Sequence, residues 1–187
     1  MSTNKTISKA VETLKQGGVI AYPTEYCFGL GCDPKNSTAI NRILKIKQRS
    51  ADHGLILLAA TLAQVEEYAQ WSDLELKNKI ESSWPGPITW LLPAKAETSK
   101  WIRGIHSTVA MRVTAHEVSR QICTQFNGAI VSTSANRHGE PSKTVASDVI
   151  TDLGKEVDFV IDLAVGDDSG SMSASKIFNG LTGEQLR

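Results

Sequence analysis

Hydroxyl and amide side chains are concentrated in one short stretch of the sequence. Residues 132–136 read Ser-Thr-Ser-Ala-Asn and directly follow the apolar segment 129–131. Such side chains donate hydrogen bonds to the oxygens of a phosphate or a carboxylate. Because the short apolar segment favours a buried strand, we expect residues 132–136 to form a polar loop at the edge of a pocket.

Cationic residues elsewhere complement this polar stretch. Lys47 and Arg49 lie at the end of a pattern typical of a helix, and Arg112 lies in the alternating run 109–113. The alternation predicts a strand with Arg112 on the face opposite the apolar side chains. Arginine binds anionic oxygens bidentately, whereas lysine acts as a mobile point charge. The combination predicts a binding site for a small polyanion.

Further motifs extend this pattern along nearly the whole chain. Residues 22–31 read Tyr-Pro-Thr-Glu-Tyr-Cys-Phe-Gly-Leu-Gly, and residues 84–89 read Trp-Pro-Gly-Pro-Ile-Thr. Five motifs follow the order found in the YrdC-like family, from Pro-Thr-Glu at 23–25 to Leu-Thr-Gly-Glu at 181–184. The chain therefore resembles that family in its short, single-domain form.

The resemblance implies an enzyme, an L-threonylcarbamoyladenylate synthase. Such an enzyme joins L-threonine, bicarbonate or CO2, and ATP into threonylcarbamoyl-AMP and pyrophosphate. The product feeds the threonylcarbamoyl modification (t6A) of adenosine 37 in tRNAs that read codons beginning with A, which separate transferase proteins complete. Mg²⁺ is expected to accompany ATP, and no tightly bound cofactor is implied. Direct binding of tRNA is possible, and no membrane partner is expected.

The resemblance also implies roles for individual residues. The proposed catalytic pair is Lys47 and Arg49, and no dedicated metal ligands are expected. The implied ATP contacts are Lys47, Arg49, His53, Thr108, Ser134, Asn136 and Ser142. The implied L-threonine contacts are Thr24, Arg112, Ser132 and Ser175.

Each of these residues also fits a simpler interpretation. A lysine or arginine at a helix C-terminus favours the helix dipole while remaining solvated. Arg112 fits a charge that protects an edge strand from aggregation. The stretch 132–136 fits a polar turn, and Thr24 fits a turn-closing hydroxyl. The sequence alone leaves these alternatives open.

The chain departs from the family pattern at a few positions near the motifs. Ser50 and Thr114 stand where many relatives have proline, and Tyr26 stands where many have threonine. A tyrosine hydroxyl reaches to a different point from a threonine hydroxyl. We therefore do not transfer a threonine-binding role to Tyr26.

Composition limits the classes of protein that remain. The 20 basic and 20 acidic residues cancel, which disfavours a strongly basic nucleic-acid binder. The three cysteines suggest a reducing compartment, and no apolar stretch is long enough for a signal core or a membrane span. We predict one domain over residues 1–187, located in the cytoplasm.

Two competing functions remain. The first is a non-catalytic module that binds tRNA or structured RNA. Its groove would be lined by Lys45, Lys47, Arg49, Arg103, Arg112 and Arg137. The second is a carbamoyl transferase resembling one segment of the hydrogenase maturation proteins, but those chains carry acylphosphatase and zinc-finger parts that are not evident here.

Periodicity predicts an α/β (α+β) domain. We expect helices near 7–16, 37–47, 61–68, 73–82, 118–126 and 145–153. We expect strands near 19–22, 55–59, 88–92, 109–113, 129–131, 157–163 and 175–178, the last entering a tight turn at Asn179-Gly180. Residues 29–31 are interpreted as a glycine-rich turn and 166–174 as a mobile loop. The resemblance implies a twisted mixed sheet flanked by helices, with a concave, positively lined cavity.

Overall fold

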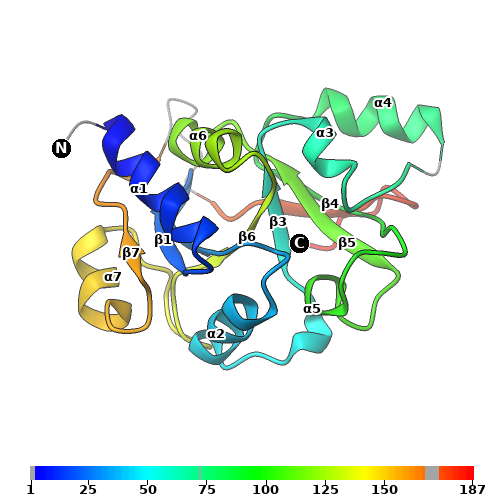
Figure 1. Ribbon diagram of the computed structural model, residues 1–187. Coiled ribbons are helices and arrows are strands. Elements are labelled where there is room, and N and C mark those ends of the chain that lie inside the picture. Colours follow the sequence, from blue (N-terminus) through cyan, green and yellow to red (C-terminus); the bar gives the residue numbers. More distant parts are fainter. Residues whose placement is uncertain (1–2, 72, 167–172) are drawn as a thin grey trace.

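The strands form one mixed sheet at the centre of the molecule (Figure 1). The computed structural model describes residues 3–71, 73–166 and 173–187, and the strand order there is β7-β1-β2-β6-β3-β5-β4-β8. Pairs β1/β7, β3/β5 and β4/β8 are parallel, and the other neighbours are antiparallel. The strands are β1 (Ile20–Pro23), β2 (Phe28–Gly31), β3 (Ile56–Ala59), β4 (Ile88–Pro93), β5 (Thr108–Val113), β6 (Ile130–Ser134), β7 (Phe159–Val160) and β8 (Lys176–Asn179).

Helices cover both faces of this sheet, so the predicted architecture is confirmed. Helices α1 and α6 lie side by side, and Ile7 of α1 and Ile122 of α6 pack against Ile130 of β6 (Figure 1). On the other face, Ile40 of α2 packs in a cluster with Phe28 of β2. The helices are α1 (Thr3–Lys15), α2 (Ser37–Lys47), α3 (Leu62–Val65), α4 (Leu74–Ser82), α5 (Lys100–Arg103), α6 (Glu117–Phe126) and α7 (Ala146–Leu153), with a 3₁₀ helix at Ala51–His53.

Helix α2 carries the first pair of predicted site residues to the sheet. Its N-cap is Asn36, whose side chain accepts a hydrogen bond from the Ala39 N–H at 3.0 Å. Gln48 adopts a left-handed conformation (φ 47°) and ends the helix. Lys47 therefore occupies the last helical position, and the chain turns immediately before Arg49.

The segment 29–31 is a strand, and its interpretation as a turn was wrong. Strand β2 pairs antiparallel with β1 and places Gly29 opposite Tyr22. A Cβ at Gly31 would lie 2.8 Å from the Tyr22 ring, and one at Gly29 would lie 3.2 Å from it. Glycine in a strand often marks a close approach by another group. Here the glycines make room for the buried Tyr22 ring, a long-range contact that the local sequence does not reveal.

The polar stretch after residue 131 also belongs largely to the sheet. Ser132, Thr133 and Ser134 extend strand β6, so the predicted loop begins only after them. Ile130 packs beneath α1 and α6, and alternation along the strand places Ser132 and Ser134 on that same face. Arg112 lies beside Leu58 in the register of β5 with β3, again on this face. The sheet therefore presents these groups together, beyond the part that the helices cover.

The C-terminal segment returns to the other edge of the sheet. Strand β8 pairs in parallel with β4, and the following turn is closed by the Asn179 N–H, which donates to the Glu184 carbonyl at 2.8 Å. The turn is therefore longer than the predicted two-residue Asn179-Gly180 turn. The predicted strand 157–163 is reduced to Phe159–Val160. Most of the predicted mobile loop 166–174 lies outside the described residues.

Candidate functional site

A cavity of about 610 Å³ opens on the sheet face that carries Ser132 and Arg112. It receives side chains from the β1–β2 connection, the end of α2, strands β4, β5 and β6, and the segment before β8. The predicted site residues that line it are Thr24, Lys47, Arg49, His53, Arg112, Ser132, Ser134, Asn136, Ser142 and Ser175. The structure thus brings together residues that are far apart in the sequence.

Lys47 is buried against the end of strand β6 and is only 7% exposed. Its Nζ donates to the Ser134 carbonyl at 2.8 Å, to Ser134 Oγ at 3.1 Å and to Asn136 Oδ1. Burial, and then the charge of Arg49, lower the pKa of Lys47 to about 8. The interpretation of Lys47 as a solvated surface cation is therefore wrong, and it loses its positive charge at a lower pH than an exposed lysine does.

Two arginines lie near Lys47. The Arg49 Nη2 donates to the His53 carbonyl at 3.5 Å. The Nε and Nη2 of Arg187 donate to the Ser175 carbonyl at 3.3 and 3.0 Å, and Arg187 lines the same cavity. Burial, and then the charge of Arg187, lower the pKa of the Arg49 guanidinium. No carboxylate of the described residues lies within the 4.0 Å of an ion pair from Lys47, Arg49 or Arg187.

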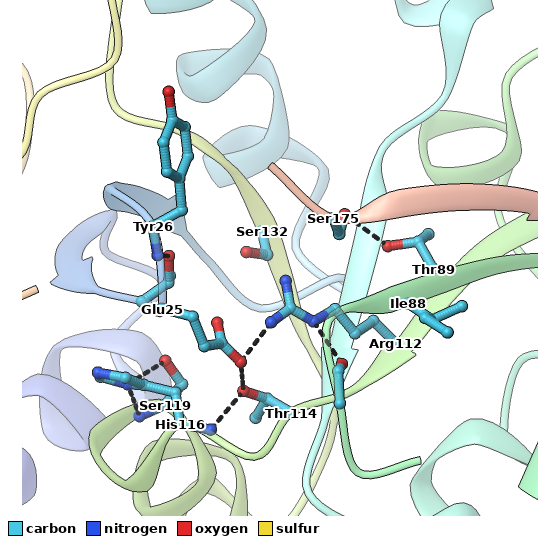
Figure 2. A network of polar contacts seen from close by, with 12 residues as sticks. Glu25, Tyr26, Ile88, Thr89, Arg112, Thr114, His116, Ser119, Ser132 and Ser175 are labelled. Atoms are coloured by element: carbon cyan, nitrogen blue, oxygen red, sulfur yellow. Dashed lines mark hydrogen bonds and ion pairs between the residues drawn. The ribbon is translucent and has the colours of Figure 1, made fainter. Parts of the chain in front are cut away.

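Arg112, by contrast, is paired with a buried acid (Figure 2). Its Nη2 forms an ion pair with Glu25 Oε1, and its Nε donates to the Gly86 carbonyl at 3.0 Å. Glu25 is 4% exposed, and its Oε2 has no hydrogen-bond partner among the described residues. Strand β5 lies between β3 and β4, so Arg112 is not an edge-strand charge. The pair forms one end of the cavity.

A chain of hydrogen bonds fixes this ion pair to the surrounding elements (Figure 2). The Thr114 hydroxyl donates to Glu25 Oε1 at 2.8 Å and accepts from the His116 N–H at 3.1 Å. His116 caps α6, where its Nδ1 accepts from the Ser119 N–H at 3.3 Å, and the Ser119 hydroxyl donates to the Pro23 carbonyl at 3.0 Å. The network ties the start of α6 to the end of β1 and holds Glu25 in place.

Hydroxyl groups complete the wall around Arg112. The Tyr22 hydroxyl donates to Ser132 Oγ at 2.7 Å, and burial raises the Tyr22 pKa well above its usual range. The Ser175 and Thr89 hydroxyls are 3.0 Å apart (Figure 2). Thr24 lines the cavity, but its hydroxyl also donates to the Cys27 carbonyl at 2.7 Å, as the simpler turn-closing interpretation required.

Thr108 is the predicted site residue that is absent from the described lining of the cavity. It begins strand β5 opposite Pro93, four positions before Arg112. Four strand residues span about 13 Å, so the same strand that presents Arg112 carries Thr108 away from it. A nucleotide contact from Thr108 therefore stays a prediction.

Two charged residues of the cavity were missed in the sequence. Glu25 was noted only as part of a motif, although its type and its place after Pro23 were a usable signal. Arg187 belongs to no motif, and its contact with Ser175 forms only after the chain turns back at 179–184. Local spacing could not have predicted it.

Several other properties bear on function. Among the described residues, no group of three or more His, Cys, Asp or Glu side chains could hold a metal ion. Cys27, Cys32 and Cys123 are buried free thiols, and burial raises the pKa of each. None of the described helices is long and apolar enough to cross a membrane.

Comparison with known sequences identifies the family. Residues 12–183 match the model of the family comprising Sua5, YciO and YrdC, which is described as "Telomere recombination". The chain belongs to this family. It is 42% identical over 184 residues to a Nitrosococcus oceani protein named threonylcarbamoyl-AMP synthase, covering 98% of both chains. A Vibrio cholerae protein of the same name is 41% identical and is covered to 99%.

Solved structures of the family have the same fold. P. abyssi Sua5, whose crystal structure contains L-threonine, is similar with a TM-score of 0.86 and 31% identity over 96% of this chain. The match covers 52% of that longer protein, so this chain spans about half of it. E. coli YciO, at 24% identity, matches over 95% of this chain and 84% of its own, with a TM-score of 0.82. The predicted family is confirmed.

Proposed function

We propose that the protein is an L-threonylcarbamoyladenylate synthase acting on L-threonine, bicarbonate or CO2, and ATP. The observation that carries the proposal is the convergence in one cavity of two unlike groups. One is the cationic cluster of Lys47, Arg49 and Arg187, and the other is the ion pair of Arg112 with Glu25. A polyphosphate suits the first and a zwitterionic amino acid suits the second. Full-length relatives named threonylcarbamoyl-AMP synthase support the same activity.

The reaction requires two steps, and each balances without a further reactant. The threonine amine adds to CO2 and loses a proton, which gives a carbamate. A carbamate oxygen then attacks the α-phosphorus of ATP, the bond to the β-phosphate oxygen breaks, and pyrophosphate leaves. Because the carbamate carries its own nucleophilic oxygen, alignment of the reactants supplies much of the catalysis.

Lys47 and Arg49 are the proposed catalytic residues of the second step. Negative charge accumulates on the phosphate oxygens as the pyrophosphate leaves, and fixed cations stabilise it. Lys47 sits beside Ser134 and Asn136, which we assign to the nucleotide together with His53 and Ser142. Every one of these side chains borders the cavity.

The Arg112 end of the cavity suits L-threonine. A guanidinium has five N–H donors, and Glu25 and the Gly86 carbonyl engage only part of that set, which leaves donors for the threonine carboxylate. Glu25 Oε2 is an acceptor for the ammonium group. Ser132 and Ser175 add hydroxyls to this end, and Thr24 lies at its rim. The Glu25 carboxylate and the Arg112 guanidinium, held side by side, complement the ammonium and carboxylate groups of an α-amino acid.

We treat Mg²⁺ as part of the ATP substrate. The only described carboxylate that lines the cavity is Glu25, and Arg112 already pairs with it. Mg²⁺ commonly retains waters and is held largely by the phosphates of the nucleotide. The residues present therefore do not form a dedicated magnesium site, and no step of the proposed reaction depends on one.

The alternative RNA-binding module receives less support. Lys47 is buried, Arg112 is half-buried and paired with Glu25, and Arg137 forms an ion pair with Glu156. These side chains do not form the solvent-facing cationic groove that such a module needs. Direct tRNA binding, transfer of the product to separate t6A proteins, a single domain over residues 1–187 and a cytoplasmic location remain predictions.

Pyrophosphate release tests the proposed function. The purified protein is incubated with ATP and Mg²⁺, and threonine or bicarbonate is omitted in turn. We expect release to require both, with threonylcarbamoyl-AMP detected by mass spectrometry. Serine serves as a control for amino-acid selectivity. RNA binding without any turnover would refute the synthase and favour the binding module.

A further inference from the structure

The ion pair of Arg112 with Glu25 uses only one oxygen of the carboxylate. The Nη2 of Arg112 pairs with Glu25 Oε1, whereas Glu25 Oε2 is buried and has no hydrogen-bond partner among the described residues. Guanidinium and carboxylate groups frequently pair through two parallel hydrogen bonds, which would engage both oxygens. The pair in this cavity therefore departs from the bidentate arrangement, and its neighbours explain why.

The Thr114 hydroxyl holds the carboxylate side of the pair. Thr114 is fully buried directly after β5, and its backbone N–H donates to the Ala59 carbonyl at 3.0 Å. Its hydroxyl accepts from the His116 N–H at 3.1 Å and donates its own hydrogen to Glu25 Oε1 at 2.8 Å. Oε1 thus meets both Thr114 and Arg112, and this shared oxygen fixes the orientation of the carboxylate.

The Gly86 backbone holds the guanidinium side of the pair. The Gly86 N–H donates to the Val113 carbonyl at 2.9 Å, and the Gly86 carbonyl accepts from Arg112 Nε at 3.0 Å. Figure 2 shows one nitrogen of Arg112 and one oxygen of Glu25 without a dashed line, both on the side of Ser132. A hydrogen-bond donor and an acceptor are therefore left next to each other at this end of the cavity.

We infer that Thr114 is a positioning residue for the amino-acid substrate. Its hydroxyl keeps the ion pair joined through Oε1, so that Oε2 stays available to the substrate ammonium. Without this hydroxyl, the carboxylate can turn and engage Arg112 through both oxygens, which removes that acceptor. Thr114 lies outside the described lining of the cavity, so it acts through Glu25. The inference rests on the proposed function for the identity of the amino acid.

Threonine binding tests this inference without turnover. Thr114→Val removes the hydroxyl with little change of shape, and the Kd for L-threonine by calorimetry should rise roughly 10- to 100-fold, as for the loss of a hydrogen bond to a charged group. Thr114→Ser keeps the hydroxyl and should bind threonine nearly as well as the wild type. Thr114→Ala removes the same hydroxyl and supplies the measurement if Thr114→Val does not fold.

Thr98→Val is the matched control for a merely structural effect. Thr98 is also buried, and its hydroxyl donates to the Tyr68 carbonyl at 2.7 Å, outside the described lining of the cavity. Both valine variants lose a buried hydrogen bond and should lower the melting temperature. We expect only Thr114→Val to weaken threonine binding and to raise the KM for threonine, while its pyrophosphate Kd and its KM for ATP stay unchanged.

The outcomes separate the inference from the proposed function. An unchanged threonine Kd in Thr114→Val, or an equal rise in Thr98→Val, would overturn the inference and make Thr114 a purely structural residue. A parallel rise in the pyrophosphate Kd would overturn it as well, since the effect would not be confined to the Glu25 end. Failure of wild-type turnover with threonine binding intact would refute the synthase, whereas the Kd comparison would still decide the role of Thr114.

Discussion

The two ends of the cavity handle charge in opposite ways. At one end Arg112 is paired with Glu25, and hydrogen bonds through Thr114 fix the pair to α6. At the other end Lys47 and Arg49 border the cavity without a carboxylate partner among the described residues. A compensated ion pair costs little repulsion and presents fixed geometry. A cluster of like charges is strained until an anion arrives, so it favours ligands of high negative charge.

This contrast explains how one small cavity can distinguish its substrates. A single carboxylate gains less from the uncompensated cluster than a polyphosphate does, because Coulomb energy grows with the charge of the ligand. A polyphosphate at the paired end would meet the negative charge of Glu25. On the site assignment that we propose, attraction and repulsion together direct each substrate to its own end.

Removal of Lys47 should have the largest effect on activity. We expect Lys47→Ala to lower the rate of pyrophosphate release roughly 100- to 1000-fold, as for the loss of one group that stabilises a developing charge. The threonine affinity should change little, because Lys47 contacts the β6 end of the cavity. The matched control is Lys45→Ala, an exposed cation on the same helix, which should retain activity. A threonine site that weakened equally would contradict the division between the two ends.

Neutralising Glu25 should have the largest effect on stability. Glu25→Gln leaves the buried Arg112 charge uncompensated, and breaking a buried ion pair costs about 3–5 kcal/mol of unfolding free energy. Threonine affinity should also fall as the ammonium acceptor is lost. Urea denaturation and threonine calorimetry measure the two effects. Arg49→Ala, at the other end of the cavity, should leave the unfolding free energy unchanged or raise it, because it removes repulsion between cations. A loss of unfolding free energy equal to that of Glu25→Gln would contradict the difference between the two ends.

The pH dependence should come from the cationic end. Lys47 has a pKa of about 8, so it is charged below that pH and becomes neutral above it. Because phosphate binding needs the charged form, ATP affinity measured without threonine should be roughly constant below pH 8 and should fall above it. In Lys47→Arg the cation stays charged, and this decline should disappear. A decline that persists in Lys47→Arg would assign the titration to another group.

Gly31 should show the smallest effect, on the packing behind the paired end. A Cβ there would lie 2.8 Å from Tyr22 and 3.0 Å from the Val131 carbonyl, so Gly31→Ala should cost about 1–3 kcal/mol of stability. Threonine affinity should fall as well, because Tyr22 holds the Ser132 hydroxyl. Gly128→Ala, whose Cβ would make an ordinary 3.6 Å contact with Phe126, is the control. Equal losses in both variants would contradict a specific role for the Tyr22 ring.

The elements that sequence predicted best are those whose signals are local. A helix was predicted near residues 7–16, and α1 buries Ile7, Ala10, Val11 and Leu14, whose spacing is that of one helical face. Strand β5 shows the predicted alternation, since its two faces have different surroundings. Residues 29–31 were not predicted as a strand, because their glycines are required by the close approach of the Tyr22 ring from the neighbouring strand.

The site residues also divide into those with a local sequence signal and those whose position depends on contacts across the fold. Motif resemblance located Lys47, Arg112, Ser134 and Asn136 at the cavity, and the structure brings them together. It did not show that Glu25 neutralises Arg112, because the network that holds Glu25 joins residues 89 apart in the sequence. Arg187 was missed for a similar reason, since its position depends on the pairing of β8 with β4. The sequence therefore predicted residue types at the site, but it did not predict contacts between residues that are distant in the sequence.

The contacts of Lys47 have a consequence for the order of events in the cavity. A lysine ammonium has three hydrogens, and Ser134 and Asn136 supply acceptors for all of them. A phosphate oxygen that binds Lys47 must therefore displace one of these acceptors, so nucleotide binding is an exchange of partners. The displaced group lies on or just after strand β6, which also carries Ser132. The proposed exchange at Lys47 therefore takes place on the strand that also carries a side chain of the proposed threonine end.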